Sequence, residues 1–297
     1  MQAENDSPVS KFHPSFDSTE ADVVLGSKDG VLFRVHSYTL KTTSAWFSSM
    51  FSLPQQQPPA EPASQVTVYL DEDSVVLEAL LRCVCGLAIP KFDSYDMIEP
   101  FLHAAEKYDM PGPLSIVRAL VMTPPLLADP LRLFVIACRY GWDDVAQLAA
   151  TKTLTLNIFS PSLRPTLQKL SSLPLLGLLD LHRGRRDRLR EGLSQFPFVS
   201  DGGPSSCSHC GSSVDYHTWR ELKHAIIMEV DARPLGDTIS EVQLMEWPQA
   251  RSCWEARCET CSRVLYDKKE TLLAVRHCID ALPMAVDPSI FSPVPSA

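Results

Sequence analysis

The apolar positions near the start of the chain follow two different periods. Apolar side chains occupy alternate positions in residues 31–36, which is typical of a strand with one buried face. Residues 28–30 before it end in Asp-Gly, a tight-turn signal, so residues 22–25 are predicted to form the partner strand. Over residues 40–51 the spacing changes to that of an amphipathic helix. The pattern therefore predicts strand, turn, strand and helix.

The same alternation of periods continues to residue 121. Pro54 and the Gln/Pro-rich residues 55–62 predict a mobile loop after the first helix. Residues 66–70 alternate as a third strand, and residues 71–74 supply N-cap candidates for a second helix. The apolar stripe of that helix consists of Val76, Leu77, Leu80, Leu81 and Val84. Further helices are predicted near residues 97–108 and 114–121.

Residues 126–195 have a purely helical pattern. A helix is expected after Asp129-Pro130, and Gly141 separates it from a second helix over residues 143–152. A third, long helix is predicted over residues 173–190. Cys138 lies on the apolar stripe of the first of these helices, so we expect it to behave as a small buried hydrophobe.

Length and composition set broad limits on the protein. A chain of 297 residues can form two or three compact units, and no apolar run approaches the length of a membrane span. Residues 1–18 are predicted to be a disordered tail without the basic and apolar regions of a signal peptide. These features predict an intracellular protein of the cytoplasm or nucleus, whose nine cysteines are thiols or metal ligands.

The net charge of −9 is unevenly distributed. Residues 1–125 carry 8 basic and 16 acidic groups, residues 126–199 carry 10 and 6, and residues 200–297 carry 9 and 14. An acidic chain is a poor general nucleic-acid binder, because contacts to phosphates need concentrated positive charge.

The strongest basic run consists of Arg183, Arg185, Arg186, Arg188 and Arg190. One interpretation is a nuclear-localisation signal or a patch for an acidic partner. The other, which we favour, is a solvated helix face that pairs with Asp180, Asp187 and Glu191.

The ordered motifs of residues 19–122 resemble those of the BTB/POZ domain in its fungal form. The matching motifs are A-D-V-V-L, S-x-D-G-x-x-F-x-V-H, L-x-x-x-S-x-x-F-x-x-M-F, V-x-L-D-E-D, L-E-A-L-L-R and A-A-E-K-Y-D-M. Cys85-Gly86 departs from the Tyr-Pro that the family often has there. Residues 126–195, with A-C-R-Y-G-W-D-D-V-A, resemble the BACK-like helical extension that follows such domains.

The resemblance implies an α+β fold, in which a three-stranded sheet packs against a helical cluster. It also implies a homodimer that forms through the first helix and the N-terminal segment, and it allows binding to a cullin. Asp22 and His36 look like the family's polar pair at the end of the sheet. We expect them to be a buried structural pair that satisfies its own hydrogen bonds, in preference to a charged groove at the dimer surface.

Two Cys-x-x-Cys pairs mark residues 200–297, which are predicted to form a small α+β unit. Cys207 and Cys210 form the first pair, and Cys258 and Cys261 form the second. Two such turns supply the four thiolates of a tetrahedral Zn²⁺ site, which would be structural because no coordination position stays open. Between the pairs, a helix is predicted near residues 216–229 and a strand near 241–247.

Other interpretations of these cysteines stay open. The first is a redox dithiol, although no thioredoxin-like pattern surrounds either pair. The second is a set of four unligated thiols. Candidates to replace one ligand are His209, His217, Cys253 and His277. We expect Trp219, Trp247 and Trp254 to belong to the core of this unit.

Three classes of function follow from the sequence. An enzyme is disfavoured, because no nucleotide-binding, metalloprotease or nucleophile-elbow motif occurs and no catalytic residue can be assigned. We favour a protein–protein interaction protein that acts as a scaffold or as an adaptor of a cullin-type ubiquitin ligase. The alternative is a zinc-containing transcriptional regulator or nucleic-acid binder, which the acidic C-terminal charge disfavours.

Overall fold

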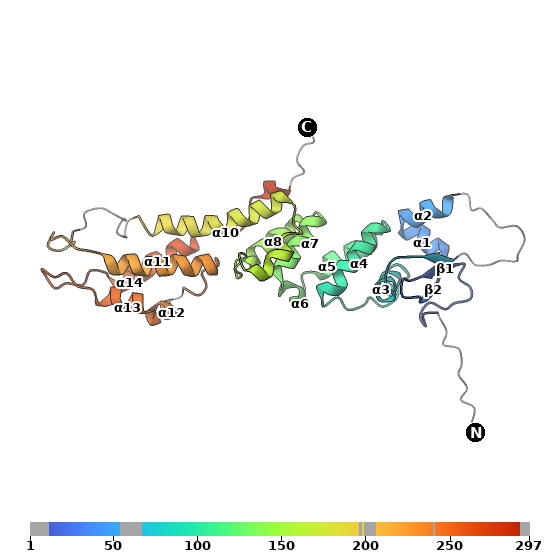
Figure 1. Ribbon diagram of the computed structural model, residues 1–297, viewed down its shortest axis with the longest axis horizontal. Coiled ribbons are helices and arrows are strands. Elements are labelled where there is room, and N and C mark those ends of the chain that lie inside the picture. Colours follow the sequence, from blue (N-terminus) through green and yellow to red (C-terminus); the bar gives the residue numbers. More distant parts are fainter. Residues whose placement is uncertain (1–11, 54–66, 196–197, 199–205, 240, 292–297) are drawn as a thin grey trace, which may run out of the picture. The chain divides into compact units, whose positions relative to one another are not determined.

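The computed structural model describes residues 12–53, 67–195, 198, 206–239 and 241–291. The chain divides into two compact units, which we call unit 1 (residues 1–128) and unit 2 (residues 129–297). Figure 1 shows the elements of each unit along the chain.

Unit 1 is built on a three-stranded sheet. Its strands are β1 (Val23–Gly26), β2 (Leu32–Val35) and β3 (Thr67–Tyr69), in the order β2-β1-β3. β1 pairs antiparallel with β2 and parallel with β3. Leu25 and Phe33 are opposite one another and are completely buried, as the alternating pattern predicts. The three predicted strands are confirmed; β1 begins and ends one residue later than expected, and β2 and β3 are shorter than expected.

Six helices of unit 1 lie within the described residues. They are α1 (Ser37–Thr43), α2 (Ala45–Ser52), α3 (Ser74–Val84), α4 (Tyr95–Lys107), α5 (Pro111–Leu120) and α6 (Pro124–Leu127). The stripe of α3 is buried as predicted, except that Val84 is half-buried. The predicted loop at residues 55–62 lies outside the described residues.

The single helix expected over residues 40–51 is interrupted at Ser44. Its backbone is extended (φ −141°), and its side chain accepts a hydrogen bond from Phe47 N at 3.0 Å, which caps α2. Its hydroxyl also donates to Tyr108 O at 2.5 Å, so the break is attached to the end of α4. The apolar stripe continues across the break, which is why hydrophobic spacing alone does not reveal it.

Within the described residues, the regular elements of unit 2 are all helices. They are α7 (Pro130–Arg139), α8 (Asp143–Thr153), η1 (Pro161–Leu163), α9 (Arg164–Leu167), α10 (Ser172–Gly192), α11 (His217–Ala232), α12 (Glu241–Glu246), α13 (Pro248–Glu255), α14 (Lys268–Asp280) and η2 (Pro288–Phe291). The strand predicted near residues 241–247 is wrong, because α12 occupies this segment. Leu244 and Trp247, three residues apart, both pack on the core, which fits a helical turn.

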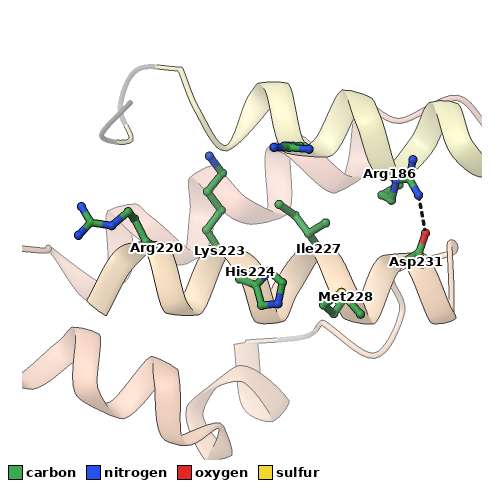
Figure 2. Close-up of a pocket in the computed structure, with 8 residues that line it drawn as sticks. Arg186, Arg220, Lys223, His224, Ile227, Met228 and Asp231 are labelled. Carbon is green, nitrogen blue, oxygen red and sulfur yellow. Dashed lines mark hydrogen bonds and ion pairs between the residues drawn. The ribbon is translucent and has the colours of Figure 1, made fainter. Parts of the chain in front are cut away.

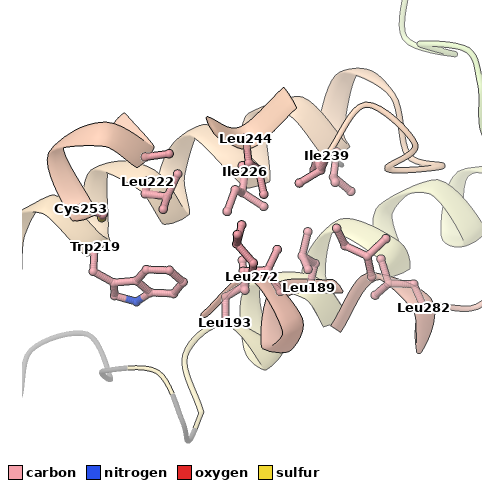
Figure 3. Close-up of a cluster of buried hydrophobic side chains, with 14 of the residues drawn as sticks. Leu189, Leu193, Trp219, Leu222, Ile226, Ile239, Leu244, Cys253, Leu272 and Leu282 are labelled. Atoms are coloured by element: carbon pink, nitrogen blue, oxygen red, sulfur yellow. The ribbon is translucent and has the colours of Figure 1, made fainter. Parts of the chain in front are cut away.

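The helices of unit 2 share one apolar cluster. Leu189 from α10 and Leu193, directly after it, pack in the same cluster as Trp219 from α11 and Leu272 from α14 (Figure 3). The sequence predicted a division between residues 195 and 200, whereas α10 and α11 here belong to one core. Burial of the apolar face of α10 requires the residues that follow it.

None of the helices in the described ranges is long and apolar enough to cross a membrane.

Candidate metal centre

The first Cys-x-x-Cys pair lies on a tight turn just before α11. Cys207 N donates to Ser212 O at 2.8 Å, and Gly211 N donates back to Cys207 O at 2.9 Å. Gly211 has φ +72°, a conformation that glycine adopts without steric cost. An antiparallel bridge between Ser206 and Ser213 closes the turn.

The second pair repeats this backbone geometry between α13 and α14. Cys258 N donates to Arg263 O at 2.9 Å, and Ser262 N donates to Cys258 O at 2.8 Å. Ser262 has φ +57°, the position that Gly211 occupies in the first turn. Arg257 and Val264 form the closing bridge. The closing bridge and the two hydrogen bonds of the first turn recur in the second turn 51 residues later, so the two turns have the same backbone structure.

The two turns bring all four predicted ligands together. The Sγ atoms of Cys207 and Cys261 are 3.8 Å apart, and those of Cys210 and Cys258 are 3.6 Å apart. All four sulfur atoms lie within 4.8 Å of one another. A tetrahedral site with bonds of about 2.3 Å has sulfur–sulfur edges of about 3.8 Å. The four cysteines thus have a geometry that could hold a metal ion.

A serine hydroxyl lies between two of these sulfur atoms. Ser212 Oγ is 2.9 Å from Cys210 Sγ and 3.4 Å from Cys258 Sγ. This hydroxyl lowers the pKa of Cys210 and, with backbone amides, lowers the pKa of Cys258 to about 6. Both effects favour the thiolate, which is the form that binds metals. At Cys261, a backbone hydrogen bond from Arg263 is outweighed by desolvation and the neighbouring cysteines, which raise its pKa to about 11. The sequence analysis did not identify Ser212, although its place two residues after a Cys-x-x-Cys pair is a usable signal.

The candidate replacement ligands do not join the cluster. His209 Nδ1 lies 3.2 Å from Arg263 Nη1, and His217 faces Asp215. Cys253 is buried in the apolar cluster and its thiol donates to a backbone carbonyl, and this burial raises its pKa to about 11. His277 is exposed on α14. Within the described residues, the cluster consists of the four cysteines alone.

The tryptophans of this region are core residues, as predicted. Trp219 is buried in the apolar cluster and stacks on Phe198 with 4.6 Å between ring centroids. Trp247 and Trp254 pack against the same cluster. Cys138 is only half-buried, and burial raises the pKa of its thiol to about 12, so it is not a reactive thiolate.

The predicted solvated face of the arginine run is wrong at Arg185. This side chain is 1% exposed. Its guanidinium donates to three backbone carbonyls, at 2.6 Å to Pro234 O, 2.6 Å to Pro283 O and 3.2 Å to Leu235 O. The helix turns Arg185 inward, where these carbonyls replace the water that a guanidinium needs.

The predicted burial of Asp22 and His36 is also wrong, because both residues are exposed. Asp22 accepts hydrogen bonds from Ser37 N at 2.7 Å and from Ser37 Oγ at 2.5 Å. These bonds lower the pKa of Asp22, and His36 adds a smaller effect of the same sign. Asp22 therefore caps α1 from the start of β1.

Comparison with known protein families gives a match within unit 1. Residues 12–122 match the model of the BTB/POZ domain. A comparison with curated proteins finds no match to the chain. The match spans the sheet and helices α1–α5 of unit 1, whose mixed α+β architecture agrees with it. Residues 12–122 of this protein are a BTB/POZ domain, a module of protein–protein interaction.

Proposed function

We propose that this protein is a non-enzymatic scaffold or adaptor, which self-associates through unit 1 and binds a target protein through unit 2. The observation that carries this proposal is the BTB/POZ domain at residues 12–122, because such domains mediate protein–protein interaction. BTB/POZ domains are generally non-enzymatic, which agrees with the lack of a catalytic motif in the sequence.

An exposed apolar surface on the first helices supports self-association. Tyr38 on α1 is 76% exposed and Leu53, directly after α2, is also exposed. Large exposed apolar side chains that lie close together are typical of interaction surfaces. α1 and α2 pack on one another, so both exposed side chains belong to the same helical pair of unit 1.

Light scattering on the full-length protein tests this proposal. We expect a homodimer, and we expect Tyr38→Asp to weaken it by tenfold or more. Val75→Asp is the matched control, because Val75 is a similarly exposed apolar residue on a different helix, α3. A wild-type monomer at high concentration would refute the proposal.

We also propose that Cys207, Cys210, Cys258 and Cys261 hold a structural zinc ion. The donor set supports it, because four thiolates at these distances suit Zn²⁺ and leave no position for a substrate. The ion would connect the start of α11 to the segment between α13 and α14.

Metal analysis of the purified protein tests the zinc proposal. We expect one zinc per chain by mass spectrometry, and its loss in Cys258→Ser. Cys253→Ala is the control, since Cys253 is buried in the same unit but outside the cluster. This variant should lose stability through packing and keep its zinc. Metal-free, fully folded wild-type protein would exclude the site.

A cullin-type ligase is the partner that the BTB/POZ domain suggests for an adaptor. Affinity purification of the full chain followed by mass spectrometry separates the two versions of the proposal. Recovery of a cullin supports a ligase adaptor, whereas other partners without a cullin indicate a scaffold.

A further inference from the structure

A groove of about 690 Å³ runs between α10 and α11 of unit 2 (Figure 2). Arg186 and Arg190 line it from α10, and Arg220, Lys223, Ile227 and Met228 line it from α11. Figure 2 shows Lys223 and Ile227 projecting from α11 toward α10, and Arg186 reaching Asp231 at one end. Arg220, Lys223 and Ile227 are spaced three or four apart, so they occupy one face of the helix, and Met228 lies beside Ile227.

The groove concentrates positive charge. Four of its lining residues are cationic, and its one carboxylate, Asp231, is already bound by Arg186 at 3.1 Å. Residues 126–199, which supply α10, carry 10 basic and 6 acidic groups, whereas residues 200–297, which supply α11, carry 9 and 14. Basic side chains that gather in a groove attract an anionic ligand.

Two of the four cations, Arg190 and Arg220, are available to a ligand at low cost. Lys223 is 4% exposed and donates to Ser194 Oγ at 2.6 Å, and Arg186 pairs with Asp187 and Asp231. Arg190 is exposed and has no ion-pair partner among the residues that the structure describes. Arg220 pairs with Asp215 at 2.5 Å, but both side chains are more than half exposed, and such pairs contribute little. An incoming carboxylate can replace Asp215 without leaving a buried charge.

Two apolar side chains also line the groove, which restricts the chemistry of the ligand. Met228 is 53% exposed and Ile227 is half-buried beside it. A flexible thioether next to an aliphatic side chain suits an apolar anchor of a peptide. A phosphate chain has no group that would gain from this contact.

We propose that this groove binds an acidic peptide segment of a partner protein, with carboxylates on the arginines and an apolar side chain on Ile227 and Met228. This inference rests on the proposed scaffold function and names the surface through which unit 2 recruits its target. From Arg220 to Asp231 the helix rises by roughly 16 Å, the length of about five extended residues. Peptides of this length that bind in open grooves have few buried anchors, so we expect micromolar affinity.

Fluorescence anisotropy with the full-length protein tests the proposal. The probe is a labelled 12-residue peptide of Glu and Asp with two central Leu residues. The comparison probes are the same peptide with Gln and Asn in place of the acids, and a 12-nucleotide oligo-dT. The variant Arg190→Glu/Arg220→Glu reverses two exposed cations of the groove. Arg183→Glu is the control, because Arg183 is exposed on the same helix outside the groove.

The expected result is micromolar binding of the acidic peptide, a loss of tenfold or more in the double variant, and no change in Arg183→Glu. The neutral peptide should bind the wild-type protein only weakly. Equal binding by the double variant, no binding by the wild type, or tighter binding of oligo-dT would each overturn the proposal. Light scattering on the same samples separates the two proposals: a dimer without peptide binding refutes the groove alone, whereas a monomer refutes the proposed function.

Discussion

Arg185 carries its charge into the interior of unit 2. Its three carbonyl acceptors belong to two segments, the turn after α11 and the turn after α14. A planar guanidinium holds five donors in a rigid fork spread over three nitrogen atoms, whereas an ammonium group has three donors on one nitrogen atom. Arg185 is therefore a structural link between helices that are distant in sequence.

We predict that Arg185→Lys lowers the free energy of unfolding of the protein by about 3 kcal/mol, because at least one buried carbonyl loses its donor. Urea unfolding followed by circular dichroism measures the change. Arg183→Lys on the same helix should change stability by less than about 0.5 kcal/mol, as exposed substitutions do. Equal stability of the two variants would show that Arg185 is not a link.

A buried histidine beside Arg185 makes unit 2 sensitive to acid. His182 is buried, and its Nε2 atom lies 3.1 Å from Thr153 Oγ1. Its Nδ1 atom is buried without a hydrogen-bond partner within the described structure. Burial, aided by the charge of Arg185, lowers the pKa of His182 to about 4.

This lowered pKa predicts a specific dependence of stability on pH. Near pH 7 both states hold a neutral imidazole, whereas between about 6.5 and 4 only the unfolded state takes up the proton. The free energy of unfolding should fall across this window by at most about 3 kcal/mol. Urea titrations at several pH values should show a smaller fall in His182→Gln. The same fall in both proteins would exclude this residue as the cause.

At the scale of elements, two helices of unit 1 receive their N-terminal caps from distant carboxylates. α3 follows Asp73, whose side chain makes no capping hydrogen bond. Asp29, in the turn after β1, instead accepts from Ser74 N at 2.9 Å and Ser74 Oγ at 2.6 Å. Hydrogen bonds from Ser27 and Ser74 lower the pKa of Asp29 to about 2. In the same way, Asp22 accepts a hydrogen bond from Ser37 N and caps α1.

We predict that Asp29→Ala destabilises the protein by about 1 kcal/mol at pH 7, the usual effect of losing a cap. Asp73→Ala should have little effect, although Asp73 is next to the helix in sequence. The contribution of Asp29 is present above about pH 4 and disappears as the pH falls toward 2, so the difference between variant and wild type should shrink in acid. Denaturant unfolding at pH 7 and pH 3 measures both effects.

The elements differ in how far the sequence predicts them. β2 and β3 follow from alternation, β1 follows from the Asp-Gly turn that pairs it with β2, and α3 follows from its apolar stripe. The segment of α12 is too short for its period to be recognised, so tertiary packing decides its conformation. The caps of α1 and α3 come from other elements, and no local pattern contains them.

At the scale of the whole molecule, the four cysteines were predictable and the groove was not. Each Cys-x-x-Cys turn is encoded locally, so the sequence predicts that the two turns meet at one site. The groove combines Arg190 of α10 with Arg220 of α11, and only the packing of the two helices brings them to one place. The linear arginine run was misleading, because helical rotation places Arg185 inside the unit.

The two compact units lead to a prediction for the full chain. We expect two thermal transitions, of which only that of unit 2 moves to lower temperature when a chelator such as EDTA is added, since the proposed zinc ligands all belong to unit 2. Differential scanning calorimetry with and without EDTA measures it, and re-added zinc should restore the transition. A shift of both transitions, or of neither, would contradict it.

The contact between Arg185 and Pro283 also has a consequence in time. These residues are 98 positions apart. At translation rates of about 5–20 residues per second, Pro283 is therefore synthesised roughly 5–20 s after Arg185. During this interval α10 exposes an apolar face that later residues cover, and its charged side chain stays hydrated. We therefore expect nascent unit 2 to complete its core only after the segment that follows α14 has emerged from the ribosome.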